Sequence, residues 1–119
     1  MQPTILIVED NVDLRNSICS VLEFENWQIL LATNGREALD ILEQHAHQVD
    51  LILTDLAMPE LSGLDLCREV RRQNQKAKIV IMTGYLSPET RAELQSMGVT
   101  HILKKPVEVQ ELLDAISCD

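Results

Sequence analysis

The chain has 119 residues, of which 45% are hydrophobic and 24% are charged, and its formal net charge is −9. This composition is ordinary for a folded protein and excludes a disordered chain, and the length suits one domain over residues 1–119. The negative charge disfavours direct binding to nucleic acid or to an anionic membrane, because both of those surfaces are also negatively charged.

Neither a membrane-spanning segment nor a secretory signal is expected. The longest apolar runs have about four residues, far short of the roughly 20 that a membrane helix needs, and the N-terminus lacks a basic stretch. The three cysteines, Cys19, Cys67 and Cys118, are widely spaced and form no C-x-x-C pattern. They are typical of reduced thiols. We therefore expect a cytoplasmic protein.

Apolar runs of strand length alternate with stretches of helical periodicity along the chain. The runs are continuous, which favours strands that are covered on both faces in a parallel sheet. They are Thr4–Val8, Gln28–Thr33, Val49–Thr54, Lys78–Thr83 and Val99–Leu103. After them, apolar residues recur at intervals of three and four, most clearly at Val109, Leu112, Leu113 and Ile116, which is typical of helices with one buried face.

Capping residues agree with this alternation. Asn34 and Glu37 have the spacing of a capping box, Ser87 precedes a first-turn proline, and Gly98 is suited to end that helix. Five strand–helix units with short connections predict a doubly wound α/β sandwich with right-handed crossovers.

Polar residues follow the predicted strands at one end. Glu9 and Asp10 follow the first strand and Asp55 follows the third, while Thr83 ends the fourth and Lys104–Pro106 follows the fifth. Since ligands of an open parallel sheet bind at the carboxyl ends of its strands, we expect these side chains to lie together. The sequence thus places three carboxylates, a hydroxyl and an ammonium at one edge.

The chemistry of such a cluster favours phosphoryl transfer. Two carboxylates ~4 Å apart repel by about 4 kcal/mol at an effective dielectric constant near 20, so three of them need a cation, a proton or an electrophile. Oxygen ligands alone suit Mg²⁺ (or Mn²⁺), which also accepts phosphate oxygens. A lysine and a hydroxyl can meet the remaining phosphoryl oxygens. Because no serine or cysteine nucleophile belongs to this cluster, the acceptor must be a carboxylate.

Four segments carry a family resemblance: Leu6–Asn11, Asp50–Pro59, Ile81–Gly84 and Lys104–Pro106. Together they resemble the receiver domain of bacterial two-component response regulators, in the order and spacing of that family and over essentially the whole chain. The resemblance implies a flavodoxin-like (βα)5 sandwich with a parallel five-stranded sheet of strand order 2-1-3-4-5. It also implies a phosphorelay signalling domain that catalyses only its own phosphoryl transfer and slow dephosphorylation.

The same resemblance implies the partners. A sensor histidine kinase or a phosphotransfer protein would donate the phosphoryl group from a phosphohistidine. An output domain or effector protein would then bind the face formed by the fourth helix, the fifth strand and the fifth helix.

Residue by residue, the resemblance implies that Asp55 is the phosphoacceptor. Asp10, Asp55 and the backbone carbonyl of Ala57 match the direct Mg²⁺ ligands, and Glu9 matches an acid that acts through a metal-bound water.

Thr83, Gly84 and Lys105 match the phosphoryl-binding positions, and the Lys105–Pro106 peptide bond matches a cis position. Ile102 stands where the family often has an aromatic switch residue. Signalling through an aromatic rotamer is therefore in doubt.

Alternatives remain open. Glu9 and Asp10 alone could mark a helix start, and Asp55 could be a turn residue. Other functions are a Mg²⁺-dependent phosphohydrolase, a flavin-binding module and an interaction module without phosphorylation. Ala57, where a hydrolase would need a second acid, disfavours the first. The lack of a phosphate-binding loop after the first strand disfavours the second, and a complete acidic site disfavours the third.

Overall fold

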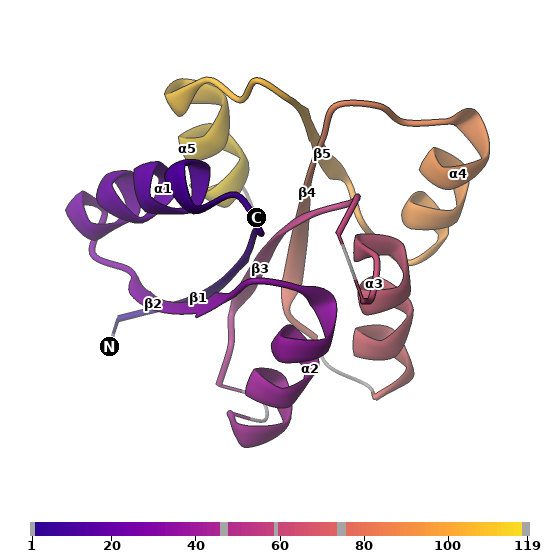
Figure 1. Ribbon diagram of the computed structural model, residues 1–119, viewed down its shortest axis with the longest axis horizontal. Coiled ribbons are helices and arrows are strands. Elements are labelled where there is room, and N and C mark those ends of the chain that lie inside the picture. The colour runs from indigo at the N-terminus through magenta and orange to yellow at the C-terminus, as the bar shows by residue number, and fades with distance from the viewer. Residues whose placement is uncertain (1, 46–47, 59, 74–75, 118–119) are drawn as a thin grey trace.

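The computed structural model describes residues 2–45, 48–58, 60–73 and 76–117. Within these ranges, five strands alternate with five helices (Figure 1). In chain order they are β1 (Thr4–Val8), α1 (Val12–Phe24), β2 (Gln28–Ala32), α2 (Gly35–Gln44), β3 (Leu51–Asp55), α3 (Gly63–Arg72), β4 (Lys78–Thr83), α4 (Pro88–Ser96), β5 (His101–Lys104) and α5 (Val109–Ser117).

The strands form one sheet in the order β2-β1-β3-β4-β5, and all neighbouring pairs are parallel. Helices α1 and α5 cover one face, and α2, α3 and α4 cover the other (Figure 1). Every residue of β1 and β3 is buried, which is the physical reason for their continuous apolar runs. The predicted fold class and strand order are confirmed.

Successive residues of a strand serve the two faces in turn, because side chains alternate across a sheet. Leu6 and Ile52 pack in the core under α2, α3 and α4, whereas Ile5 and Leu53 pack in the core under α1 and α5.

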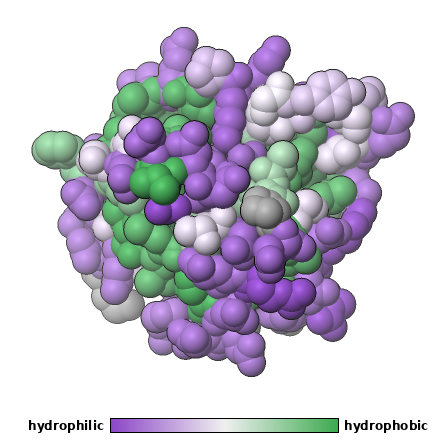
Figure 2. Space-filling view, in the orientation of Figure 1, coloured by the Kyte–Doolittle hydropathy of each residue, from purple (hydrophilic) through white to green (hydrophobic). Residues whose placement is uncertain are grey.

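Figure 2 shows hydrophilic residues over much of one face of the molecule, with apolar residues visible in patches between them. No helix of the described residues is long and apolar enough to cross a bilayer.

Three of the predicted strands have boundaries that were wrong by one or two residues. β2 ends at Ala32, β3 runs from Leu51 to Asp55, and β5 runs from His101 to Lys104. Val99 is fully buried, but its N–H donates to the carbonyl of Leu94 at 3.0 Å and so helps to end α4. Gly98 adopts a φ of 83° there, a left-handed conformation that glycine adopts readily. Because Val99 is buried, the predicted fifth strand was longer at its start than the hydrogen-bonded strand β5.

The helix starts carry side-chain caps. The side chains of Asn34, Ser62 and Ser87 each accept a hydrogen bond from the N–H three residues on. Asn11 does the same for α1, accepting from the N–H of Leu14 at 3.0 Å. The cap of α1 is therefore Asn11, which leaves the two preceding acids outside the helix.

Candidate functional site

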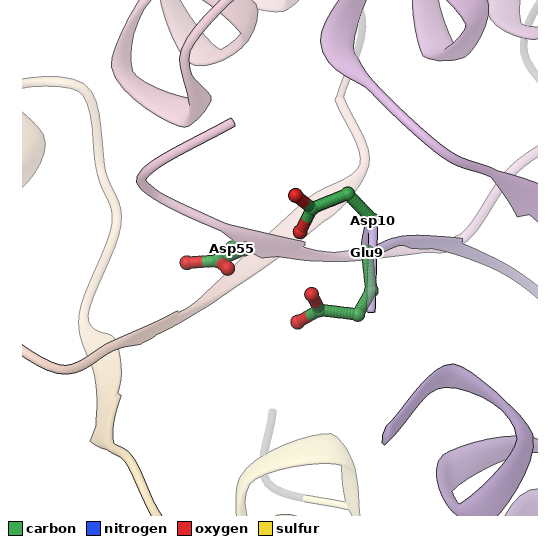
Figure 3. A group of neighbouring side chains, drawn as sticks. All are labelled: Glu9, Asp10 and Asp55. Carbon is green, nitrogen blue, oxygen red and sulfur yellow. The ribbon is translucent and has the colours of Figure 1, made fainter. Parts of the chain in front are cut away.

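Three acids meet at the carboxyl ends of the central strands. Glu9 and Asp10 directly follow β1, and Asp55 is the last residue of β3, which pairs with β1. One oxygen from each carboxylate lies within 4.8 Å of the other two. Figure 3 shows Glu9 and Asp10 extending from the end of β1 toward the end of β3, where Asp55 lies. The convergence predicted from the strand ends is present.

The three carboxylates differ in exposure. Glu9 is completely buried, Asp55 is 7% exposed and Asp10 is exposed. Burial raises the pKa of Glu9 and the carboxylates of Asp10 and Asp55 raise it further, against the opposing hydrogen bonds from the N–H of Asn11 and from Lys105. The protein thus holds Glu9 at an electrostatic cost that its hydrogen bonds from Asn11 and Lys105 offset only in part.

Lys105 reaches this cluster from the end of β5. Its Nζ donates to Oε1 of Glu9 at 2.9 Å and to Oδ2 of Asp55 at 2.8 Å. Burial lowers the pKa of Lys105, but the hydrogen bonds and charges of Asp55 and Glu9 outweigh that effect and raise it. Its backbone N–H donates to the carbonyl of Thr83 at 2.8 Å, and the following peptide bond to Pro106 is cis. Lys105 is therefore held by backbone and side chain at once.

The loop between β3 and α3 folds back over Asp55. The N–H of Ala57 donates to Oδ1 of Asp55 at 3.3 Å, and that of Gly63 donates to the carbonyl of Leu56 at 2.8 Å. A Cβ at position 63 would lie 2.3 Å from the carbonyl oxygen of Asp55, which no side chain tolerates. Gly63 is thus required for the close approach that positions the loop.

Two residues near the acids were missed by sequence reasoning. Gly63 is one, since a single glycine before a helical stretch does not reveal what its backbone touches. Arg15 of α1 is the other, and its Nη1 donates to the backbone carbonyl of Glu9 at 3.0 Å. No spacing signal links Arg15 to Glu9, because the contact depends on the angle at which α1 leaves β1.

Thr83 lies at the same edge, but its hydroxyl is occupied by its own loop. Oγ1 donates to the carbonyl of Tyr85 at 2.6 Å and accepts from the N–H of Tyr85 at 3.2 Å. Gly84 is exposed, with nothing within 4 Å of the position of a Cβ. Ile102 of β5 is half-buried and pairs in register with Ile81 of β4.

The donor set fits a divalent cation. Its oxygens are all from carboxylates, which hard cations such as Mg²⁺ prefer. If all three acids are ionised, Lys105 compensates one of the three negative charges, and two negative charges remain for a cation to neutralise. An acidic cluster of this kind is typical of the Mg²⁺ site of receiver domains.

Known proteins match nearly the whole length of the chain. The family model described as the response regulator receiver domain matches residues 5–117. Response regulator RppA of Synechocystis is 37% identical over 109 residues, which cover 92% of this chain and 47% of the relative. Sporulation initiation phosphotransferase F of Bacillus subtilis is 29% identical over 98% of this chain and 92% of its own.

Solved structures agree with these matches. The response regulator receiver protein of Pseudomonas putida superposes with a TM-score of 0.89 at 28% identity and covers 98% of this chain and 97% of that one. Chemotaxis protein CheY4 of Vibrio cholerae gives 0.88 at 28% identity over 98% of both chains. This chain spans about half the length of the first three curated relatives, 45–48% of each. The chain belongs to the response regulator receiver domain family, whose members are signalling modules of two-component systems rather than conventional enzymes.

Proposed function

We propose that Asp55 accepts a phosphoryl group from the phosphohistidine of a histidine kinase or phosphotransfer protein, with Mg²⁺ (or Mn²⁺). The observation that carries the assignment is how differently the three acids are held. Asp55 is oriented by Lys105 and by the N–H of Ala57, yet keeps 7% of its surface exposed. Glu9 has no exposed surface, and Asp10 has no bond to Lys105.

The transfer is an in-line displacement at phosphorus. An oxygen of the Asp55 carboxylate forms the new P–O bond while the P–N bond of the phosphohistidine breaks, and its electron pair leaves on the imidazole nitrogen, which takes a proton. Lys105, 2.8 Å from Asp55, compensates the charge of the phosphoryl oxygens. Asp10, Asp55 and the carbonyl of Ala57 would hold a divalent cation, with Glu9 acting through a water, and such an ion would supply further neutralisation of the phosphoryl oxygens.

The signal would pass through the loop that follows β4. For its hydroxyl to meet a phosphoryl oxygen, Thr83 must exchange its 2.6 Å bond with the carbonyl of Tyr85 for the new partner. Gly84, next to it, leaves room for the phosphoryl group because it has no side chain. Since Ile102 carries no ring, we expect the shift to be led by residues 83–85 and to reach an output domain or effector through the α4–β5–α5 face.

The test is phosphorylation by acetyl phosphate with Mg²⁺, followed by intact-protein mass spectrometry. Wild type should gain one acid-labile phosphoryl group, Asp55→Asn none, and Asp10→Asn much less because it lacks a ligand. Asp40→Asn, an equal charge change on the exposed side of α2, should react like wild type. Undiminished labelling of Asp55→Asn, or labelling that persists in EDTA, would overturn the proposal.

A further inference from the structure

Arg15 of α1 is held against the backbone of the acid site. Its Nη1 donates to the carbonyl oxygen of Glu9 at 3.0 Å, and its side chain is half-buried. Its own backbone N–H donates to the carbonyl of Asn11 at 2.9 Å, so the residue is fixed in the first turn of the helix. A guanidinium makes a strong, directional hydrogen bond because it is planar and always charged. No step of the proposed phosphoryl transfer uses this bond.

The carbonyl that Arg15 bonds belongs to the peptide group between the two neighbouring acids. The peptide groups on either side of it are held by other contacts. The N–H of Glu9 donates to the carbonyl of Ala32 at 3.1 Å, and the N–H of Asn11 donates to Oε2 of Glu9 at 3.0 Å. Because a peptide group is planar, fixing its carbonyl also fixes the direction in which the chain enters the next residue. Arg15 therefore orients the peptide group that leads into Asp10.

Asp10 depends on this orientation because Lys105 does not hold it. Lys105 bonds the side chains of Glu9 and Asp55. Asp10 has no bond to Lys105 and is exposed. Figure 3 shows the side chains of Glu9 and Asp10 leaving the end of β1 in different directions. The direction of the Asp10 carboxylate is thus set by the backbone that carries it.

We propose that Arg15 is a positioning residue that holds Asp10 in the direction required by Mg²⁺ and so makes the site select Mg²⁺ over Ca²⁺. This inference rests on the proposed function of Asp10 as a metal ligand. Mg²⁺ demands nearly octahedral oxygens at about 2.0–2.1 Å, whereas Ca²⁺ accepts flexible arrangements at about 2.3–2.6 Å. A carboxylate that is free to turn therefore costs the site more of its affinity for Mg²⁺ than for Ca²⁺.

The charge of Arg15 has the opposite effect to its hydrogen bond. A positive charge beside the acids repels a divalent cation, so loss of the charge alone should strengthen the binding of Mg²⁺ and of Ca²⁺ alike. Loss of the bond should weaken the binding of Mg²⁺ more than that of Ca²⁺. Because the two ions carry the same charge, the ratio of their affinities separates positioning from electrostatics.

NMR titration of the metal-free protein with Mg²⁺ and with Ca²⁺ measures both affinities at the acid site, through the amides of residues 10, 11 and 57. Arg15→Met and Arg15→Gln should each bind Mg²⁺ at least about tenfold more weakly than wild type, with a much smaller loss for Ca²⁺. Arg15→Lys, which keeps a charged donor, should recover part of the selectivity. Lys76→Met, a charge change of the same size at an exposed residue just before β4, is the control and should match wild type.

Urea unfolding in EDTA identifies which variants are folded under the conditions of the titration, and either neutral variant suffices for the test. A wild-type ratio of Mg²⁺ to Ca²⁺ affinity in a folded neutral variant would overturn the proposal. Tighter binding of both ions in that variant would show that Arg15 acts by its charge alone and would also overturn it.

A double-mutant cycle with Asp10→Asn tests whether Arg15 acts through Asp10. In the Asp10→Asn background, Arg15→Met should cause no further loss of selectivity, and a loss as large as in wild type would contradict the proposal. If Asp10→Asn binds Mg²⁺ as tightly as wild type, the metal site of the proposed function fails, and the role of Arg15 fails with it. A loss in Asp10→Asn with none in Arg15→Met would refute the role of Arg15 and leave the proposed function standing.

Discussion

Replacing Asp10 with asparagine should stabilise the protein in the absence of metal. The change removes one of three carboxylates whose oxygens lie within 4.8 Å of one another. At that separation, two unit charges repel by about 3.5 kcal/mol at an effective dielectric constant of about 20. Asp10 is exposed and Lys105 already pairs with the other two acids, so screening reduces the gain. We expect a net gain of about 1–3 kcal/mol in the free energy of unfolding.

Urea unfolding in EDTA and in Mg²⁺ measures this gain and its cause. Mg²⁺ should stabilise wild type by mass action, roughly 2.7 kcal/mol at a hundred times its dissociation constant, and should stabilise Asp10→Asn much less. Asp40→Asn controls for the loss of a negative charge from an acidic protein and should stay within about 0.5 kcal/mol of wild type.

A loss of stability in Asp10→Asn without metal would refute this reasoning. It would mean that Asp10 stabilises the fold as a helix-start residue, which is the ordinary explanation that the sequence alone left open. An equal response of both proteins to Mg²⁺ would instead show that the ion binds elsewhere.

Three further outcomes follow from the geometry. Gly63→Ala should destabilise the protein by about 2–3 kcal/mol in urea unfolding, because its Cβ would lie 2.3 Å from a backbone oxygen, whereas Gly84→Ala meets nothing within 4 Å and should be near neutral. Because burial raises the pKa of Glu9, wild type should lose stability relative to Glu9→Gln as the pH rises above the ordinary glutamate range, and parallel pH curves of the two proteins would contradict this. Burial also raises the pKa of Cys67 to about 12. Iodoacetamide at pH near 8 should therefore label the native protein far more slowly at Cys67 than at Cys19, and equal rates at the two cysteines would contradict this.

The fold could be predicted because its strongest signals are local. Continuous apolar runs, helical spacings and caps each depend on a few neighbouring residues, and the structure contains all five strand–helix units. The two strand starts predicted too early, at Val49 and Val99, are errors where burial and hydrogen bonding diverge. Val99 is as buried as a strand residue, but its N–H bonds to Leu94 and ends a helix. A pattern of hydropathy cannot separate these two cases.

The convergence of the three acids with Lys105 could be predicted, but the contributions of Gly63 and Arg15 and the bonding within the site could not. Parallel strands end at one edge, so residues at strand ends converge, and this brought Asp55 and Lys105 together across 50 positions of sequence. The bonds of Arg15 to Glu9 and of Thr83 to Tyr85 depend on helix angle and loop shape. Neither the angle of a helix nor the shape of a loop produces a periodic pattern in a single sequence.

Chemical trapping of the acceptor tests the central claim most directly. After phosphorylation by acetyl phosphate with Mg²⁺, borohydride reduces an aspartyl phosphate to homoserine, and tandem mass spectrometry of the peptides locates the change. We predict homoserine at position 55 and an unaltered aspartate at position 10. Reduction at Asp10, or an unreduced Asp55 in protein that carries an acid-labile phosphoryl group, would contradict the assignment of Asp55 as the phosphoacceptor.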